Sequence, residues 1–590
     1  MTVVKKVLHL NNKTLFIIQL LFILFSLFSL TNTDSSANVY VLLFFLGAAS
    51  LIYNNCTNTH SLPRQKARVY AVASSLFSIC VLFANYKYLL LFTGIITLVD
   101  TLSKVLIVLV GSFCSSWNTL LLLENIGAQQ KQNNSTYICS LKGTILLCFV
   151  SISAINIINL FVFEYPGNLT PDSVDQMTQL LSNEYSNHHP FYHTMLVKAC
   201  VSFGLTLFDE INAAVACYSV FQILFMATCF TSCVATLYQA RVPWPWILIT
   251  ICFFTLMPYH IAYSITMWKD IPFGGAVLLL ITALFRFFEN IGTRQWINWV
   301  LLIIGSFGTC LWRSNGWVAF AITSVAFIAC FFSCYKKISL TLLIILACTY
   351  IMIHPILAHL GVSQPDTIES LSIPAQQIAR VSVEEGDISS EELALLDQII
   401  DTDKIPDAYK PYISDPIKNL VRKKGNQDLI KEHKLDYLKL WFSIGLKNPT
   451  KYLAAWIDQT KGYWNGGYRY WIWRNSIHEN SLGISKMDTI SFNKLHGVQR
   501  YIFNSFYNED IFDVFRSIGL CTWTIVCCGF INLANKRNKL AFLVVPPLSI
   551  IITLCIATPV YSEFRYAYAL FTCAPLIVCA TLKKEEDIDG

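Results

Sequence analysis

A short polar segment, residues 164–190, places two aspartates and two adjacent histidines between strongly apolar stretches of the chain. Asp172 and Asp175 occur in PDSVDQ, where Pro171 can start a helix and a spacing of three places both carboxylates on one helix face. Two carboxylates held close together repel, which raises the pKa of one of them and suits it to act as a general base. The other interpretation is structural, because acidic residues also favour the first turn of a helix. Spacing alone leaves both open.

Two adjacent histidines, His188 and His189, stand in NHHP just before a proline. An imidazole can bind a phosphate, ligate a metal ion or move a proton, so the pair is a candidate for orienting a substrate. Metal ligation normally needs further ligands at a suitable spacing, and none follows here. The pair alone favours packing at a membrane interface, and contact with a substrate, without a metal site, is the functional interpretation of His188 and His189.

Further polar residues interrupt the chain where apolar stretches end. They are Lys269 and Asp270 in MWKDIPF, Arg313 and Asn315 in WRSNG, and Glu563, Arg565 and Tyr566 in SEFRYAY. Arginine can bind a phosphate through two parallel hydrogen bonds, and lysine can bind it as a point charge. Both residue types also flank membrane spans for reasons of solvation alone. Each residue is ambiguous by itself, and together they are candidates for binding a substrate.

The elements that position these residues belong to a membrane protein. The chain has 590 residues, of which 54% are hydrophobic and 14% charged, whereas an average soluble domain has about 25% charged residues. Its 20 cysteines lie mostly in apolar stretches, which indicates buried hydrophobic side chains and not a disulfide framework. The chain lacks the basic tract that would predict nucleic-acid binding. This composition predicts an all-α polytopic protein in a lipid bilayer.

Apolar stretches long enough to span a bilayer predict about 14 transmembrane helices. Lysine and arginine gather in alternate connections, and the rule that such connections face the cytoplasm places both termini there. The same rule places two polar loops, residues 164–190 and 260–272, outside the cytoplasm. The stretch 190–208 starts with proline, contains Lys198 and is followed by Asp209 and Glu210. We expect it to lie along the outer interface or to dip into it without crossing.

These boundaries divide the chain into four parts. Residues 1–142 predict an N-terminal four-helix membrane region, and residues 143–359 a membrane core that carries the two outer loops. Residues 360–515 are mostly polar with helical patterns, which predicts one large, mainly helical extracytoplasmic domain. Residues 516–590 supply a C-terminal region of three membrane helices. On this topology all the candidate residues lie on one face of the membrane.

Taken in order, six short motifs resemble an uncharacterised bacterial multipass branch of the GT-C superfamily of membrane glycosyltransferases. They are PGNLTPDSVDQ (166–176), NHHP (187–190), MWKDIPF (267–273), WRSNG (312–316), SLSIPAQQIARV (370–381) and SEFRYAY (562–568). The first four predicted helices have no counterpart in the GT-C core. The resemblance implies a GT-C-like core in residues 143–359, with an acidic residue of the first outer loop as the catalytic base.

The activity that the resemblance implies is transfer of a sugar, with inversion, from a polyprenyl-phosphate donor to a glycan or protein acceptor of the cell envelope. By position Asp172 corresponds to the base, with Asp175 as its substitute, and Asp270 corresponds to the acidic position of the second outer loop. Three basic residues would hold the departing phosphate: Lys269, Arg313 and Arg565. Members of the superfamily differ in metal dependence, so the need for a divalent cation stays open.

A transporter or lipid flippase for cell-envelope glycans is the alternative function. Such a protein needs ionisable residues along a path through the membrane, often within inverted repeats. Asp100 and Lys104, four residues apart in an apolar stretch, are the main candidates of that kind, and no repeated half is visible in the chain. A third interpretation, a binding or scaffolding membrane protein, predicts outer loops that tolerate substitution.

Overall fold

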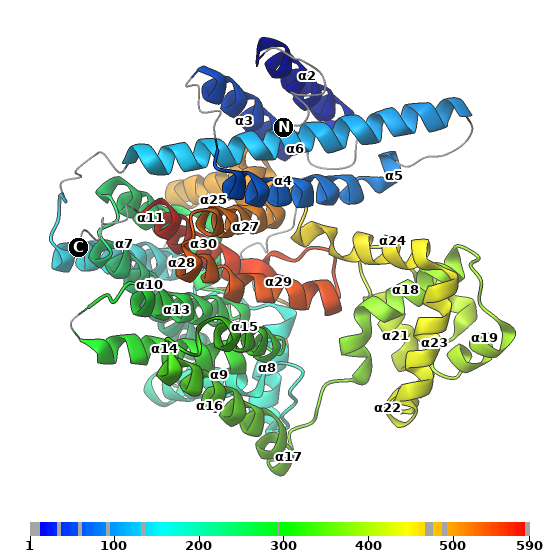
Figure 1. Ribbon diagram of the computed structural model, residues 1–590. Coiled ribbons are helices and arrows are strands. Elements are labelled where there is room, and N and C mark those ends of the chain that lie inside the picture. The colour runs from blue at the N-terminus through cyan, green and yellow to red at the C-terminus, as the bar shows by residue number, and fades with distance from the viewer. Residues whose placement is uncertain are drawn as a thin grey trace.

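The protein is built from helices. The computed structural model describes residues 12–31, 37–56, 62–89, 95–130, 137–292, 294–466, 476–486 and 493–583. Within these ranges the helices are joined by short connections and a few isolated backbone bridges, without a strand. Figure 1 shows a large bundle of long helices and a smaller group of short helices at one end of it. The all-α prediction is confirmed.

Many of the described helices suit a bilayer. Eleven are long and apolar enough to cross a membrane, or up to 13 if each of two bent pairs forms one span. The bent pairs are α11 (Trp244–Leu256) with α12 (Pro258–Ser264), and Asp510–Arg516 with α27 (Ile518–Ala534). Two further apolar helices are shorter, α14 (Gln295–Leu311) and α15 (Gly316–Phe331). The helices indicate a multi-pass membrane protein, and the count of about 14 stays a prediction.

The first helices pack against one another and against the end of the chain. They are α2 (Asn12–Thr31), α3 (Ala37–Cys56), α4 (Arg64–Ala84), α5 (Tyr86–Leu89) and α6 (Ile95–Gln130). Ile23, Phe44 and Val108 lie in their shared core. Phe77 of α4 meets Trp523 of α27 edge to face, with ring centroids 5.1 Å apart. This group is therefore attached to the bundle through α27.

Helix α13 (Asp270–Phe288) is the centre of the bundle and is buried along almost its whole length. Helices α10 (Ile211–Gln239), α14, α28 (Asn538–Phe542), α29 (Val545–Ala557) and α30 (Phe564–Leu582) pack against it. Outside them, α7 (Leu141–Ile158) and α9 (Phe191–Phe208) pack on α10, and α16 (Lys336–Ile351) packs on α14. Thr572 of α30 donates a hydrogen bond to the carbonyl of Gly274 at 2.9 Å. Helices α13 and α30 therefore begin at the same end of the bundle, and each brings a polar motif there.

Glycines on α14 allow it to approach α13 closely. A Cβ added to Gly305 would lie 2.5 Å from the backbone nitrogen of Leu280 and 2.9 Å from the carbonyl oxygen of Ala276. We expect Gly305→Ala to push the helices apart and to lower the free energy of unfolding by about 1–3 kcal/mol, the usual effect of overpacking.

Thermal unfolding of the purified protein tests this expectation. Gly143→Ala on α7 is the matched control, because a Cβ there meets only ordinary contacts, 3.5 Å from the Oγ of Ser140 and 3.6 Å from the Cβ of Cys139. Equal melting temperatures for the Gly305→Ala, Gly143→Ala and unchanged proteins would contradict close packing at this position.

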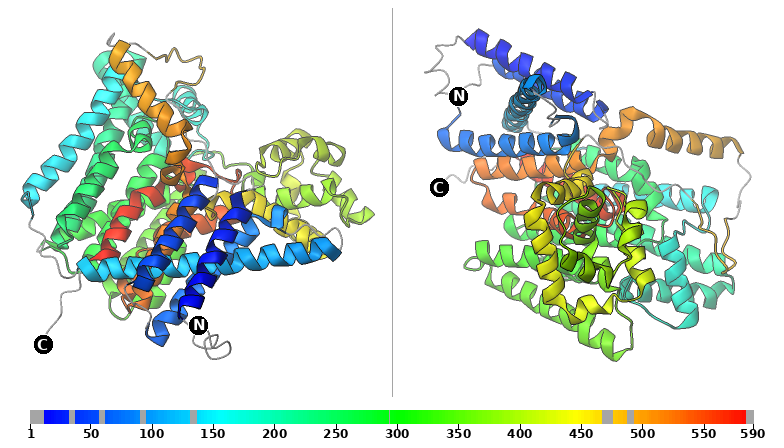
Figure 2. Two further views of the ribbon diagram at one scale, coloured as in Figure 1. Left: turned by 90° about the horizontal axis from the view of Figure 1, so that it is seen from above. Right: turned by 90° about the vertical axis from the view of Figure 1, so that its right-hand side faces the viewer.

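The smaller group of helices has a hydrophobic core of its own. It contains α18 (Ser372–Val383), α19 (Ser390–Asp397), α20 (Ile405–Ala408), α21 (Asp415–Lys424), α22 (Asp428–Glu432) and α23 (Lys434–Lys447). Figure 1 shows α24 (Pro449–Thr460) between this group and the bundle, and the left view of Figure 2 shows the group to one side of the bundle. We refer to residues 366–452 as the helical side domain.

The side domain is shorter than the extracytoplasmic domain predicted for residues 360–515. Tyr463 and Trp464 are buried in the core of the bundle, as are Phe503 and Phe506 of α25 (Asn493–Asn508). Large aromatic side chains bury much apolar surface when they pack in a core. The described residues after α24 therefore belong to the bundle and not to the side domain. The sequence pattern showed helices here but not which core they join.

Helix α9 covers the stretch expected to lie along the interface. It has 18 residues and is apolar enough to cross a membrane. His193 near its start bonds to Tyr218 of α10, whereas a Cβ on Gly204 would meet Ala214. The two helices, joined by a short connection at residues 209–210, therefore pack against each other. Whether α9 spans the membrane stays a prediction.

Candidate functional site

Backbone hydrogen bonds tie the first polar loop to two distant segments. The N–H of Asn168 donates to the carbonyl of Ile265 at 2.8 Å, and the N–H of Met267 donates to the carbonyl of Asn168 at 3.0 Å. The N–H of Leu169 donates to the carbonyl of Ser476 at 3.2 Å, and the N–H of His478 donates to the carbonyl of Leu169 at 2.8 Å. The loop that leads to Asp172 is therefore fixed beside the segment that leads to α13.

Helix α8 (Pro171–Ser182) begins at a well-formed cap. Thr170 is the N-cap, and its side chain and that of Ser173 each accept from the other's backbone N–H. The Ser173 hydroxyl also donates to the carbonyl of Met267 at 2.7 Å. This cap supports the structural interpretation of PDSVDQ, and it also fixes Asp172 in the first turn, where the helix dipole favours a negative charge.

The carboxylate of Asp172 is held by two cations. Its Oδ2 lies 2.7 Å from Nη1 of Arg565 at the start of α30 and 3.4 Å from Nζ of Lys269 at the start of α13. Burial alone would raise the pKa of Asp172, but Lys269, Arg565 and the nearby His189 together hold that pKa well below its usual range. Asp172 is therefore ionised at all physiological pH values.

His189 links Lys269 to the second aspartate. Its Nδ1 accepts a hydrogen bond from Nζ of Lys269 at 2.7 Å, and its Nε2 lies 3.1 Å from Oδ2 of Asp175. Because an ammonium group can only donate, the imidazole proton must be on Nε2, which donates to Asp175. Burial and the charge of Lys269 lower the pKa of His189, so the ring is neutral at pH 7.

Asp175 is more exposed than Asp172, with 54% of its side chain accessible to solvent. The hydrogen bond from His189 lowers its pKa, with help from Gln179, which donates to it at 3.2 Å. Both aspartates are thus ionised, and neither has the raised pKa expected from repulsion between two carboxylates. The predicted rise in the pKa of one aspartate is wrong, because cations and hydrogen-bond donors around each carboxylate stabilise its charged form.

A second, fully buried ion pair lies beside the first. Oδ1 of Asp270, whose side chain is 0% exposed, is 2.7 Å from Nη1 of Arg313 at the end of α14. The same guanidinium donates to the carbonyl of Tyr566 at 2.9 Å and lies 4.6 Å from the centre of the Tyr566 ring. Arg313 therefore connects the starts of α13 and α30.

Glu563 is the acidic residue of this cluster whose pKa is raised. Burial raises the pKa of its carboxyl to about 7, and the charges of Asp270 and Asp172 add to this effect while Arg565 opposes it. Its Oε1 lies 3.4 Å from Nε of Arg565. Arg565 in turn lies over the ring of Trp268 at 4.8 Å. Glu563 can gain or lose a proton near neutral pH.

This pKa has a consequence for stability. An acid with a raised pKa keeps its proton in the folded state while the unfolded state has lost it, so stability falls as the pH rises from about 4.5 to about 7. The loss amounts to about 3 kcal/mol when converted at 1.36 kcal/mol for each pH unit. We expect Glu563→Gln to remove this contribution.

Denaturation of the unchanged and Glu563→Gln proteins between about pH 5 and pH 8 measures the difference. Taking the difference cancels the opposite trend from His189, whose lowered pKa makes the folded state more stable as the pH rises. Parallel stability curves for the two proteins would show that Glu563 does not titrate in this range.

Nine of the eleven candidate residues meet in one cluster at the starts of α8, α13 and α30. They are Asp172, Asp175, His189, Lys269, Asp270, Arg313, Glu563, Arg565 and Tyr566. His188 is exposed beside this cluster, its ring 4.8 Å from that of His189. Asn315 points elsewhere, because its amide donates to Thr553 of α29 at 2.7 Å and so joins α15 to α29.

A buried chain of hydrogen bonds below the cluster was not anticipated. Gln176 donates to His193 at 3.0 Å, His193 meets the hydroxyl of Tyr218 at 2.9 Å, and that hydroxyl donates to Gln222 at 2.9 Å. The amide of Gln222 then donates to the carbonyls of residues 263, 264 and 266 at 2.8–3.0 Å. A glutamine within the apolar stretch of α10 was the signal in the sequence, since buried polar groups need partners.

The cluster does not suit a divalent cation. No group of three or more possible metal ligands comes together within the described parts of the chain. Lys269 and Arg565 already neutralise Asp172, and Arg313 neutralises Asp270. A metal ion would have to displace these cations from the carboxylates.

Comparison with known proteins yields one family. No curated protein and no solved structure matches the chain. A model described as a family of unknown function, DUF6020, matches residues 181–589. The match begins after Asp172 and Asp175 and includes the other candidate residues. Because it covers more than two thirds of the chain, the protein belongs to the DUF6020 family.

Proposed function

We propose that the protein is an inverting membrane glycosyltransferase that uses a polyprenyl-phosphate sugar. It would act on the outer face of the cytoplasmic membrane of a bacterium, with both termini in the cytoplasm. The observation that carries the proposal is the carboxylate of Asp172 between Arg565 and Lys269. A base and two phosphate-binding cations within hydrogen-bond reach of one another are what transfer from a sugar phosphate requires.

The cations would receive the donor phosphate. Lys269, Arg313 and Arg565 lie in one cluster, and each now binds a carboxylate of the protein. The donor phosphate is a phosphodiester with one negative charge, and on entering this cluster it competes with Asp172 for Lys269 and Arg565. Lys269 and Arg565 hold the pKa of Asp172 down. When they bind the donor phosphate in place of Asp172, the pKa of Asp172 rises and the carboxylate becomes a stronger base.

The transfer step then has a residue for each change of charge. Asp172 takes the proton of an acceptor hydroxyl while the hydroxyl oxygen forms a bond to the anomeric carbon. The bond from that carbon to the phosphate oxygen breaks, and its electron pair stays on the phosphate. Lys269 and Arg565 stabilise the growing negative charge, which is the usual main contribution of such groups. Attack opposite to the leaving phosphate inverts the anomeric centre.

His189 and Asp175 would position Lys269 in this scheme. The carboxylate of Asp175 fixes the imidazole proton on Nε2, which leaves Nδ1 free to accept from Lys269. The ammonium group is thereby directed toward Asp172 and the phosphate site. Glu563 lies beside Arg565 and would gain or lose its proton near neutral pH. It would thereby change the net charge next to the guanidinium that binds the phosphate.

The prenyl chain of the donor also has a candidate site. An apolar groove of about 800 Å³ lies between α9 and α10, the helices that follow His189. Phe203, Phe208 and Phe221 line it, as does Tyr165 of the first polar loop. A chain in this groove would stay in the bilayer while its phosphate reached the cluster.

Analysis of lipids and glycans from cells without the gene tests the proposal. We expect a polyprenyl-phosphate sugar to accumulate and a cell-envelope glycan or glycoprotein to lack that sugar. Purified protein with the accumulated lipid and the deficient acceptor should then restore the linkage with inverted configuration. Unchanged lipids and glycans in these cells would refute the proposal.

The rival function, a transporter or flippase, rests on Asp100 and Lys104. These residues pair with each other at 2.5 Å on α6, with about half of each side chain exposed. A pair on an exposed helix face is neutralised in place and does not favour a path through the bundle. Loss of lipid movement in an Asp100→Asn protein, with the cluster variants active, would favour the transporter.

A further inference from the structure

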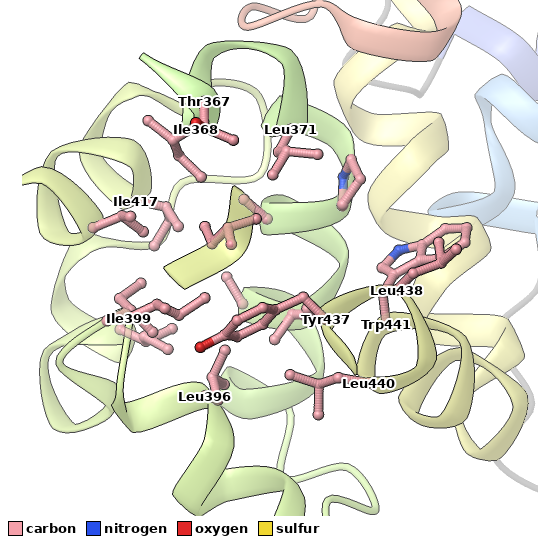
Figure 3. Close-up of a pocket in the computed structure, with 18 of the residues that line it drawn as sticks. Thr367, Ile368, Leu371, Leu396, Ile399, Ile417, Tyr437, Leu438, Leu440 and Trp441 are labelled. Carbon is pink, nitrogen blue, oxygen red and sulfur yellow. The ribbon is translucent and has the colours of Figure 1, made fainter. Parts of the chain in front are cut away.

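The helical side domain contains a large apolar cavity. It has a volume of about 440 Å³ and lies between α18, α19, α21 and α23. Figure 3 shows Ile368, Leu371, Leu396, Ile399 and Leu440 around it. This volume is within the range of about 300–1,000 Å³ that is usual for small-molecule sites. The cavity passes through the core of the domain, where protein interiors are normally close-packed.

The lining indicates an apolar ligand with a polar part. Engineered apolar cavities of about 150 Å³ already bind benzene, and this cavity is larger. Two hydroxyls of its lining, those of Thr367 and Tyr437, are buried and have no hydrogen-bond partner within the described residues. Lys434 also lines the cavity, and it forms no ion pair within the part of the chain that the structure describes. Its ammonium group is available to an anion.

The outer face of α23 indicates where such a ligand comes from. Four large apolar side chains form a stripe along this helix: Leu435 is 69% exposed, Leu438 56%, Phe442 58% and Leu446 72%. Their spacing of three and four residues puts them on one side of the helix. Lysines 431, 434, 439 and 447 accompany them. A helix with an exposed apolar side and flanking lysines is typical of one that lies in a lipid–water interface.

Leu438 connects the two features, because it belongs to the exposed stripe and also lines the cavity. We propose that α23 rests on the surface of the bilayer and that the cavity takes one aliphatic chain of an anionic lipid, whose head group binds Lys434. The chain passes beside Leu438 into the core of the side domain. This site is separate from the charged cluster, and the proposal does not depend on glycosyl transfer.

Photolabelling of the full-length protein in lipid nanodiscs tests the site. The probe is a long-chain fatty acid with a diazirine near its methyl end, and the labelled peptides are identified by mass spectrometry. We expect labels on residues 396–400 and 417–421, which line the inner part of the cavity. The matching alcohol, which has no charge, serves as the neutral probe. Excess unlabelled fatty acid or farnesyl phosphate shows which head group competes better.

Two kinds of variant separate the chain site from the charge site. Ala379→Phe fills the cavity from its buried side, and Ala375→Trp fills it from its partly exposed side, where folding is less disturbed. We expect either variant to remove most of the label from the cavity peptides. Lys434→Gln should lower labelling by the acid about two- to fivefold, as for an exposed ion pair, and leave labelling by the alcohol unchanged.

Lys439→Gln is the matched control, since Lys439 is on the same helix but pairs with Asp436 at 3.8 Å and does not line the cavity. It should label like the unchanged protein. The chain site would be overturned if the cavity peptides of the unchanged protein carried no label, or if those of the Ala375→Trp and Ala379→Phe proteins were labelled as strongly as in the unchanged protein. Equal effects of Lys434→Gln on both probes would overturn the head-group contact.

Discussion

The Asp172→Asn protein is expected to transfer sugar about a thousandfold more slowly than the unchanged protein, within the range known for loss of a general base. An amide has nearly the shape of the carboxylate, but it cannot take the proton of the acceptor hydroxyl. Initial rates with the purified lipid donor and acceptor measure the effect. The same variant should bind inorganic phosphate more tightly, because Arg565 and Lys269 lose the anion that now competes for them.

Two controls define this result. Asp175→Asn should slow transfer less, because Asp175 acts on the phosphate site only through His189 and Lys269. Asp397→Asn on α19, whose partner is Lys424 in the side domain, should have no effect on the rate. Full activity in both the Asp172→Asn and Asp175→Asn proteins would remove the basis for assigning the base to this loop.

The second large effect is on stability, at the buried pair of Asp270 and Arg313. Replacing Arg313 by methionine leaves the carboxylate of Asp270, which is 0% exposed, without a cation. We expect the free energy of unfolding to fall by about 3–5 kcal/mol, as is usual when one partner of a buried ion pair is removed. Denaturation of the purified protein measures this change.

A double variant shows whether the unpaired charge is the cause. Asp270→Asn combined with Arg313→Met removes both charges, and we expect it to recover much of the stability that Arg313→Met loses. Arg422→Met in the side domain is the control. Arg422 pairs with Asp366 and Glu369 at a position more exposed to solvent, so this variant should cost about 1 kcal/mol or less for each pair. A double variant less stable than Arg313→Met would contradict the pairing.

Local features of the charged cluster could be predicted from the sequence. PDSVDQ predicted a helix that starts at Pro171, and the structure places α8 there with Thr170 as its cap. The polar residues at the ends of apolar stretches were recognised as a group because such residues are rare in a membrane protein. Their assignment to one membrane face stays a prediction, whereas their convergence in space is a property of the structure.

The pairing within the cluster could not be predicted. Nothing in the spacing of residues indicates that Asp172 faces Arg565 or that Asp270 faces Arg313, since these contacts arise from how α8, α13, α14 and α30 pack. The extent of the side domain was missed for a similar reason. Tyr463 and Phe506 lie in the segment for which the sequence predicts an extracytoplasmic helical domain, and only packing decides which core takes an aromatic side chain.

The distance along the chain between Asp172 and Arg565 also bears on how the protein is made. The two residues are 393 positions apart, and a ribosome adds roughly 5–20 residues per second, so roughly 20–80 s separate their synthesis. Lys269 arrives earlier, but throughout this interval the guanidinium that binds Asp172 most closely does not yet exist. A nascent chain that stops before α30 therefore carries an incomplete charged cluster. The charged cluster is complete only when α30 has joined α13.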